Sequence, residues 1–340
     1  MAQISIPDER SELLMPARMP APVIAALEAR FRLHRLWEQD DREAFLARVG
    51  PRIRGVAVGP AFGRVDASLF DRLPALEIVA GFGVGYDYID TAAAAERGVV
   101  VTNTPGVLDD EVADLTIGLL LATIRRIPQA DRFLREGRWR ERHFPLSPTL
   151  RGRRIGIVGL GHIGKAVARR LDGFGVAVAY HGRHRQPDIA YPYHDSVVAL
   201  AEASDVLIVV VPGGAGTRHL IDAAVVRALG PDGVLINVSR GSVVDQAALI
   251  EALMEGRILA AGLDVYEDEP HVPEALVALD NTVLLPHIGS ASVETRAAMG
   301  QLVVDNLVSW FDGRGAVTPV AESLGAIGAS SRSSRAKSRD

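Results

Sequence analysis

The sequence predicts an α/β protein with parallel, doubly wound sheets, and three observations favour this fold class. Short apolar runs with the length of buried strands alternate with longer segments of helical periodicity. One of these strands is followed by a glycine-rich turn and then by a helical segment, which is the order of a βαβ unit. The chain has 340 residues, which is enough for two domains that each have a hydrophobic core.

The composition is that of an ordinary globular protein. Hydrophobic residues make up 48% of the chain, charged residues make up 23%, and the formal net charge is −5. This mildly acidic balance argues against a nucleic-acid-binding function, which usually requires a clustered basic face. The chain has no cysteine, so disulfides and thiolate metal sites are excluded.

The N-terminal residues 1–10 have neither the basic region nor the apolar core of a secretory signal peptide. The longest apolar runs are short or interrupted by charge, so no membrane span is predicted. We therefore expect a cytoplasmic protein. The nine histidines show no ligand spacing with carboxylates or with one another, and no metal site is predicted.

The segment 12–103 predicts a small α/β unit. A strand that begins at Ile78 ends in a glycine-rich loop whose backbone N–H groups can receive an anion, although such a loop can also be a plain turn. A proline follows the last strand of this segment and indicates a hinge or domain boundary. The expected strands are 13–15, 31–36, 55–59, 78–81 and 99–102, and the expected helices are 21–28, 40–48 and 91–97.

A long helix is expected at 109–124, where acidic residues precede an apolar body. Pro128 limits this helix. The following residues, 129–150, contain Trp139, Phe144 and several arginines without a clear period. This pattern fits an arm that packs on another subunit, and it fits a surface helix and loop nearly as well.

A dinucleotide site is indicated between the strand 155–158 and the helix expected at 165–174. Gly159, Gly161 and Gly164 have the GxGxxG spacing. The first glycine permits a tight turn, the second lets the backbone approach a pyrophosphate, and the third lets the helix pack closely on the strand. The pyrophosphate then lies at the helix N-terminus, where free N–H groups and the dipole favour negative charge.

The next strand, 176–180, predicts which dinucleotide is bound. NAD-specific sites usually place an acidic residue after this strand to hold the ribose 2′-OH. Here the strand is followed by Gly182, Arg183, His184 and Arg185, which leave room for a 2′-phosphate and supply guanidinium donors to it. We therefore predict a preference for NADPH, with NADH use possible. The alternative is that both arginines belong to an ordinary solvated loop.

Strands and helices continue to alternate after this loop. In a doubly wound sheet the functional residues are expected at the carboxyl ends of the strands, beside the cofactor. A helix is expected at 293–311, where the chain returns to the first half of the molecule. The small, polar and basic segment 325–340 is expected to be disordered. The further expected strands are 206–211, 234–239, 259–265 and 282–285.

Three of these strand ends provide an arginine, a carboxylate and a histidine, namely Arg240, Glu269 and His287. Reduction of a 2-keto acid requires these types: a cation for the substrate oxygens, a proton donor, and a carboxylate that orients the donor. Histidine suits proton donation because the pKa of an imidazole lies near neutrality. Each residue alone has an ordinary structural explanation, and only their combination in one dinucleotide fold favours catalysis.

Five motifs are specific when taken together, namely Gly83 to Asp87, Gly159 to Gly164, Asn237 to Asp245, Gly262 to Pro270 and Pro286 to Ser290. With them the chain resembles the D-isomer-specific 2-hydroxyacid dehydrogenases over about residues 12–320. Through Tyr180 to Pro187 the resemblance is closest to NADPH-using glyoxylate/hydroxypyruvate reductases and hydroxyphenylpyruvate reductases.

The resemblance implies a discontinuous flavodoxin-like substrate domain, 1–103 with 288–324, and a dinucleotide-binding domain at 104–287. It also implies a homodimer joined through the dinucleotide-binding domain. Val84 and Gly85 would offer backbone N–H groups to the substrate carboxylate, with Arg240 and His287 completing the substrate site.

The resemblance also extends the cofactor site. Pro212 and Thr217 would flank the cofactor, Ser239 would lie near the ribose, and Asp264 would lie near the nicotinamide amide. The complete expected cofactor set is Gly159, Gly161, His162, Ile163, Gly164, Gly182, Arg183, Arg185, Val211, Pro212, Thr217, Val238, Ser239, Arg240, Asp264, His287, Gly289 and Ser290.

The predicted function is NADPH-dependent reduction of small 2-keto acids, such as glyoxylate and hydroxypyruvate, to D-2-hydroxy acids, with His287 as the proton donor. The alternative is a reductase of hydroxyphenylpyruvate or phenylpyruvate, which needs a wider substrate pocket. A regulator that senses dinucleotides without catalysis is disfavoured, because the chain has no long interaction segments beyond its short basic tail.

Overall fold

The computed structural model describes residues 10–59 and 63–324. The chain forms two compact units, one made of 1–108 with 293–340 and the other of 109–292. The predicted boundaries of the dinucleotide-binding domain, 104 and 287, lie five residues before the observed ones at both ends. The predicted disordered tail, 325–340, lies outside the described residues.

The first unit contains a five-stranded parallel sheet in the order β2-β1-β3-β4-β5. This is the order of flavodoxin-like folds, so the predicted fold class is confirmed for this unit. Its strands are β1 Glu12–Met15, β2 Arg32–Arg35, β3 Ile53–Val58, β4 Ile78–Gly81 and β5 Val100–Thr102, and its helices are α1 Ala21–Arg30, α2 Arg42–Val49, α3 Ala67–Phe70, α4 Thr91–Glu96 and α12 Val293–Phe311.

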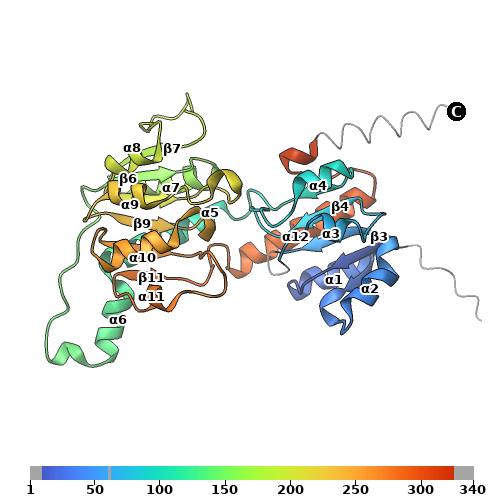
Figure 1. Ribbon diagram of the computed structural model, residues 1–340, viewed down its shortest axis with the longest axis horizontal. Helices are drawn as coiled ribbons and strands as arrows, with labels where there is room; N and C mark the ends of the chain where they lie inside the picture. Colours follow the sequence, from blue (N-terminus) through green and yellow to red (C-terminus); the bar gives the residue numbers. More distant parts are fainter. Residues whose placement is uncertain (1–9, 60–62, 325–340) are drawn as a thin grey trace, which may run out of the picture. The chain divides into compact units, whose positions relative to one another are not determined.

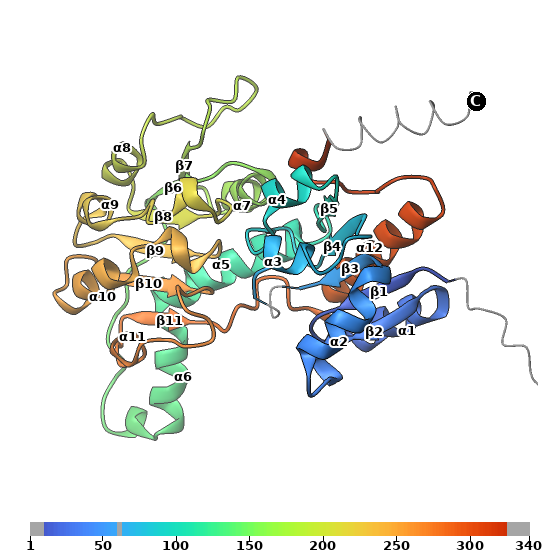
Figure 2. The same ribbon diagram turned by 45° about the vertical axis from the view of Figure 1, so that its right-hand side comes forward.

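The return of the chain through α12 is held by a buried side chain. Asn306 is fully buried and accepts hydrogen bonds from the N–H groups of Val317 and Thr318 at 3.0 and 2.9 Å. Thr318 in turn donates through its hydroxyl to the carbonyl of Asn103, which follows β5. The orange-red α12 therefore lies with the blue and cyan elements of this unit (Figures 1 and 2).

The second unit contains a six-stranded parallel sheet in the order β11-β10-β9-β8-β6-β7. Its strands are β6 Arg154–Val158, β7 Ala177–His181, β8 Val206–Val209, β9 Val234–Asn237, β10 Ala260–Leu263 and β11 Thr282–Leu284. Its helices are α5 Asp109–Arg125, α6 Ile127–Arg135, α7 His162–Asp172, α8 Val197–Glu202, α9 Ala223–Leu229, α10 Gln246–Met254 and α11 Glu274–Val277.

The order of this second sheet creates a switch point. From β6 the chain moves outward to β7, and a single parallel bridge between Tyr180 and Tyr193 extends the sheet beyond β7. The chain then returns to form β8 on the other side of β6. Ligands of doubly wound sheets bind outside the carboxyl ends of the strands at such a reversal, which here means the ends of β6 and β8.

The core explains why these segments are strands. Ile155 and Ile157 of β6 are fully buried on the face covered by α5 and α7, whereas Val158 belongs to the cluster on the opposite face. Since side chains alternate between the faces of a strand, an uninterrupted apolar run fits a strand that is buried on both sides.

Two helix predictions need correction. The helix predicted at 165–174 begins three residues earlier, at His162, because the N–H groups directly after Gly161 already belong to its first turn. Pro128 does not merely end the preceding helix. It occupies the first turn of α6, where a proline costs nothing because that N–H has no partner within the helix.

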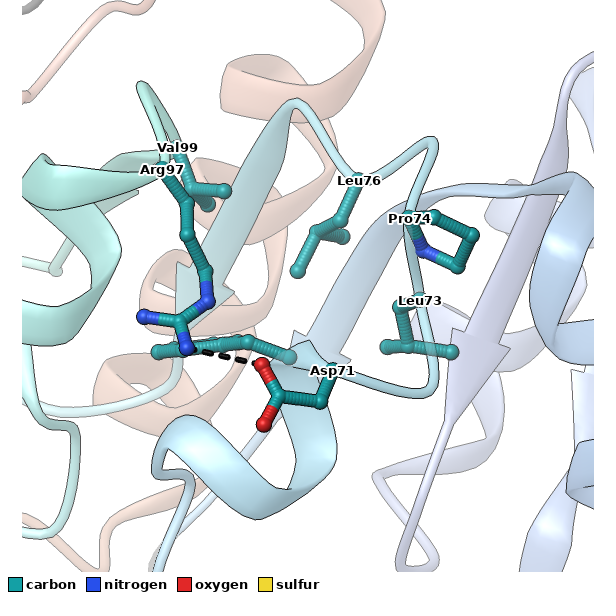
Figure 3. A pocket seen from close by; sticks show the side chains of 7 residues that line it. Asp71, Leu73, Pro74, Leu76, Arg97 and Val99 are labelled. Carbon is teal, nitrogen blue, oxygen red and sulfur yellow. Dashed lines mark hydrogen bonds and ion pairs between the residues drawn. The ribbon is translucent and has the colours of Figure 1, made fainter.

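The first unit also has a hollow at the amino ends of β4 and β5, away from their carboxyl ends. It has a volume of about 370 Å³, and the ion pair between Arg97 and Asp71, 2.7 Å long, lies at its side (Figure 3). Within the described residues, no helix has the length and apolar character needed to cross a membrane.

Candidate active site

The glycine-rich loop between β6 and α7 is shaped by close backbone approach. A Cβ on Gly164 would lie 2.1 Å from the carbonyl oxygen of Gly159, and a Cβ on Gly159 would lie 2.7 Å from Val211. Gly159 also has a φ of 98°, a conformation that glycine adopts without strain. The first and third glycines are thus required by the packing of the turn, the helix and the end of β8.

Gly161 is different, because open space surrounds the position of its missing Cβ. It caps α7 without a side-chain hydrogen bond, and the first turn of α7 contains no acidic residue. The backbone there is open to an anion, and the helix dipole favours negative charge at this end. This cradle fits the pyrophosphate of a dinucleotide. His162 is largely exposed beside it, and Ile163 packs partly into the core.

The loop after β7 presents the predicted phosphate ligands. Arg183 and Arg185 are exposed, and Gly182 is half-buried. Among the described residues, neither guanidinium forms a hydrogen bond or an ion pair, so both have donors available for a phosphate.

Other expected cofactor residues follow the neighbouring strands β8 and β9. Val211 and Pro212 come directly after β8, and Thr217 donates its hydroxyl hydrogen bond to the carbonyl of Pro212 at 2.7 Å. Val238 and Ser239 follow β9. The second unit therefore places the ends of β6, β7, β8 and β9 along one edge of its sheet, as predicted.

A buried asparagine holds the turn that contains Arg240. The side-chain oxygen of Asn237 accepts hydrogen bonds from the N–H and the hydroxyl of Ser239 at 3.0 and 2.7 Å. Its amide donates to the carbonyl of Arg240 at 3.1 Å. Asn237 is 1% exposed, so the direction in which Arg240 leaves β9 is fixed from the core.

The loop after β10 contains Glu269 and is anchored by Tyr266. The hydroxyl of Tyr266 donates to the carbonyl of Leu285 at 3.0 Å, and burial raises the pKa of Tyr266 to about 12. The N–H of Tyr266 donates to Glu269 at 3.0 Å. A Cβ on Gly241 would lie 1.8 Å from the Tyr266 backbone, so only glycine permits the turn after Arg240 to lie against this loop.

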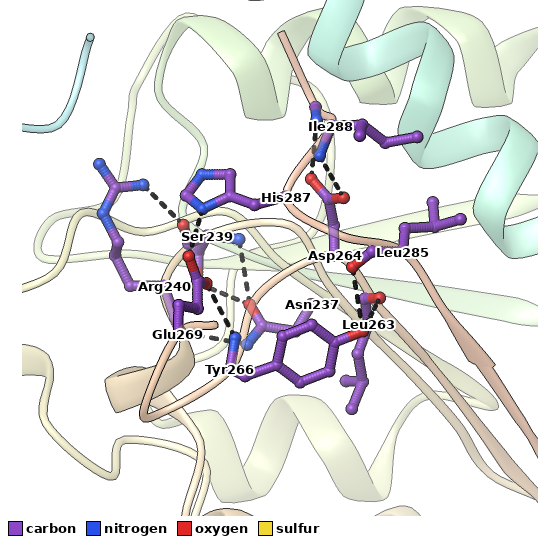
Figure 4. A network of polar contacts seen from close by, with 11 residues as sticks. Asn237, Ser239, Arg240, Leu263, Asp264, Tyr266, Glu269, Leu285, His287 and Ile288 are labelled. Carbon is purple, nitrogen blue, oxygen red and sulfur yellow. Dashed lines mark hydrogen bonds and ion pairs between the residues drawn. The ribbon is translucent and has the colours of Figure 1, made fainter. Parts of the chain in front are cut away.

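The loop after β11 contains His287 and is held by Asp264. Asp264 is 1% exposed, and its carboxylate accepts hydrogen bonds from the N–H groups of Ile288 and Gly289 at 2.7 and 2.8 Å (Figure 4). His287 itself has a φ of 54°, which costs energy for a residue with a side chain. The two hydrogen bonds stabilise this unfavourable backbone conformation.

His287 and Glu269 form a direct pair. The Nδ1 atom of His287 lies 2.7 Å from a carboxylate oxygen of Glu269, and Arg240 reaches the same region from β9 (Figure 4). This bond directs Nδ1 toward the carboxylate and leaves Nε2 to act on a substrate. The side chains of His287 and Glu269 are 39% and 33% exposed, so the pair is accessible.

Electrostatics keep Glu269 ionised. Burial would raise the pKa of Glu269, but the hydrogen bonds from His287 and from the Tyr266 N–H, with the charge of Arg240, outweigh burial and lower this pKa below its ordinary value of 4.5. For Asp264 burial dominates and raises the pKa. Within the described residues, no group of three potential ligand side chains is arranged to hold a metal ion.

The expected substrate contacts at Val84 and Gly85 lie in the first unit, in the loop after β4. Gly83 donates its N–H to the hydroxyl of Thr104 at 3.1 Å, and the amide of Asn103 donates to the carbonyl of Val84 at 2.8 Å. Within the described residues, the N–H groups of Val84 and Gly85 have no acceptor, so they remain available to an anion.

The sequence predicted no role for Asn237 and Tyr266, and for Asp264 only a position near the nicotinamide amide. The structure shows that all three hold, through hydrogen bonds of their buried side chains, the loops that contain Arg240, Glu269 and His287. A polar residue at the end of an apolar strand, as in Val234-Leu-Ile-Asn237, is the pattern that could have identified such a residue.

Comparisons with known proteins agree with this geometry. Residues 117–289 match the model of the D-isomer specific 2-hydroxyacid dehydrogenase family, NAD binding domain. A glyoxylate/hydroxypyruvate reductase A of Arabidopsis thaliana is 48% identical, and a hydroxyphenylpyruvate reductase of Plectranthus scutellarioides is 49% identical. Both alignments cover 91% of this chain and 98% of the relative.

Among solved structures, an NADPH-dependent glyoxylate/hydroxypyruvate reductase of Sinorhizobium meliloti, in complex with NADP and malonate, is 53% identical. It has a TM-score of 0.87 and is matched over 92% of this chain and 98% of its own. The chain belongs to the D-isomer specific 2-hydroxyacid dehydrogenase family.

The lowered pKa of Glu269 gives a testable pH dependence. Because the folded pKa lies below the unfolded value, ionised Glu269 stabilises the fold above a pH of about 4.5, and this contribution is lost as the pH falls through the folded pKa. The free energy of unfolding of wild type minus that of Glu269→Gln should therefore shrink as the pH falls below about 4.5. Urea titrations of both proteins at several pH values measure this difference in the free energy of unfolding. A difference that stays constant with pH would contradict the lowered pKa of Glu269.

Proposed function

We propose that this protein reduces small 2-keto acids, glyoxylate and hydroxypyruvate among them, to D-2-hydroxy acids with NADPH as the reductant. The observation that supports this most directly is the pair of His287 and Glu269, joined at 2.7 Å at the carboxyl edge of the dinucleotide-binding sheet. The names of the relatives, glyoxylate/hydroxypyruvate reductase above all, agree with it.

In the proposed reduction, each residue of the site has a separate role. When bound, the reduced nicotinamide supplies the hydride that reduces the keto carbon. His287 gives a proton from Nε2 to the carbonyl oxygen, and Glu269 orients the ring and stabilises its protonated form. The positive charge of Arg240 stabilises the negative charge that develops on the substrate oxygens. The N–H groups of Val84 and Gly85 bind the substrate carboxylate.

The cofactor would lie over the glycine-rich loop. Gly161 and the N-terminus of α7 bind the pyrophosphate, and the guanidinium groups of Arg183 and Arg185 bind the 2′-phosphate of NADPH. NADH, which lacks this phosphate, would still bind, though more weakly.

A reductase of aromatic keto acids is the second candidate, because the relative from Plectranthus scutellarioides is a hydroxyphenylpyruvate reductase of nearly the same identity. Rates with glyoxylate and hydroxypyruvate, compared with those for phenylpyruvate and 4-hydroxyphenylpyruvate, separate the two. Faster NADPH oxidation with the small acids supports the first candidate, and faster oxidation with the aromatic acids supports the second.

We also propose that the enzyme is a cytoplasmic homodimer. The segment from α6 to Leu150 exposes apolar side chains, each more than half exposed, as a surface that packs on a second copy would. They are Ile127, Leu134, Trp139 and Leu146.

Removing the proton donor should abolish most of the activity. His287→Ala is expected to lower kcat by about 10²–10⁴-fold, which is the usual contribution of a general acid. Steady-state kinetics with saturating NADPH and hydroxypyruvate measure this loss, and the exposed His271, changed to Ala, serves as the control. Undiminished turnover by His287→Ala would refute the assigned role.

The loop after β7 should set cofactor preference. The double variant Arg183→Ala with Arg185→Ala is expected to raise KM for NADPH by about tenfold or more, because two charge-assisted hydrogen bonds are lost. KM for NADH should change little. If the variant keeps the wild-type KM for NADPH, these arginines are not phosphate ligands.

The proposed dimer is tested by measuring the molar mass of the protein in solution. Sedimentation equilibrium should give twice the 36.4 kDa of one chain, and the double variant Trp139→Glu with Leu146→Glu should shift the protein toward the monomer, because charge on an apolar interface opposes association. A wild-type protein that sediments as a monomer at micromolar concentration would contradict the proposal.

A further inference from the structure

The loop that presents Arg183 and Arg185 is tied to the strand before it. Tyr180 belongs to β7 and is fully buried, yet its hydroxyl lies 2.8 Å from the backbone nitrogen of Gln186, whose N–H donates to it. The bond spans six residues and closes the loop directly behind the two arginines. A buried hydroxyl thus fixes where this loop ends.

The side chain of Gln186 makes a second tie. Its Nε2 donates to the carbonyl oxygen of Leu160 at 2.8 Å. Leu160 stands between Gly159 and Gly161, in the loop proposed to bind the pyrophosphate. One side chain therefore joins the loop for the pyrophosphate to the loop for the 2′-phosphate.

The returning part of the loop adds further restraint. The ring of Tyr193 packs against that of Tyr180, with centroids 5.3 Å apart, and its hydroxyl donates to the carbonyl of Gly182 at 3.2 Å. The backbone of Tyr180 also pairs with Pro192 and His194 at 2.9 Å each. The loop is therefore held at Gly182, before the two arginines, and at Gln186, directly after them.

This restraint matters because the arginines themselves are exposed and, within the described residues, unpaired. Ordering a mobile loop and two long side chains around a phosphate costs conformational entropy, and a loop that is already held in place avoids part of that cost. A ligand without a 2′-phosphate gains nothing from it.

We propose that Gln186 is a positioning residue for cofactor specificity, which holds Arg183 and Arg185 in register with the pyrophosphate loop so that both phosphates of NADPH are bound together. This rests on the proposed NADPH use. Tyr180 supports the same function through its hydroxyl.

The test uses Gln186→Met, which keeps the length of the side chain but removes its donor. Binding of 2′,5′-ADP and of 5′-AMP, which differs from it only in lacking the 2′-phosphate, to the full-length protein is measured by titration calorimetry. We expect Kd for 2′,5′-ADP to rise about three- to tenfold, the effect of one lost hydrogen bond, and Kd for 5′-AMP to stay within about twofold. Tyr180→Phe should act in the same direction.

Two controls make the result specific. Gln301→Met removes a surface hydrogen bond to Asp305 on α12 and should change neither Kd. In the background of Arg183→Ala with Arg185→Ala, Gln186→Met should have no further effect on 2′,5′-ADP, because its action passes through the arginines.

The outcomes separate this inference from the proposed function. If wild type does not prefer 2′,5′-ADP over 5′-AMP, the proposed cofactor preference fails. If wild type prefers 2′,5′-ADP and both Gln186→Met and Tyr180→Phe, folded by circular dichroism, keep that preference unchanged, the positioning inference fails alone. Equal weakening of both ligands would also overturn it, since that indicates general damage to the site.

Discussion

The site depends first on the buried carboxylate of Asp264. Burying a carboxylate is costly unless hydrogen bonds offset the loss of water, and here the N–H groups of Ile288 and Gly289, at 2.7 and 2.8 Å, offset part of that cost. The same bonds stabilise the left-handed backbone of His287. The energy that keeps Asp264 in the core thus also fixes the direction in which the proposed proton donor points, and the pair with Glu269 follows from that direction.

The same design recurs along the edge of the second sheet. Asn237 holds the turn of Arg240, Tyr266 holds the loop of Glu269, and Tyr180 holds the loop of the two arginines, each by hydrogen bonds from a buried side chain. Exposed reactive groups are therefore positioned by polar groups in the core. Buried polar networks of this kind specify one arrangement because a partly satisfied alternative costs more.

Much of this was predictable. The apolar strands, the glycine spacing and the three strand-end residues are local patterns, so the sequence predicted the two parallel sheets, the loop after β6, and Arg240, Glu269 and His287 near one edge. The hydrogen bonds that hold these loops were not predictable, because they join residues more than twenty positions apart in the sequence, such as Gln186 with Leu160 and Asp264 with Ile288. The start of α6 was missed since a proline both ends one helix and begins another.

The most direct test of the account follows the hydrogen itself. NADPH labelled with deuterium at both C4 positions of the nicotinamide is incubated with the enzyme and hydroxypyruvate, and the product is analysed by mass spectrometry and chiral chromatography. The account predicts D-glycerate with one deuterium on C2, and its formation should be nearly abolished in His287→Ala. Absence of deuterium from C2, or formation of the L isomer, would contradict it.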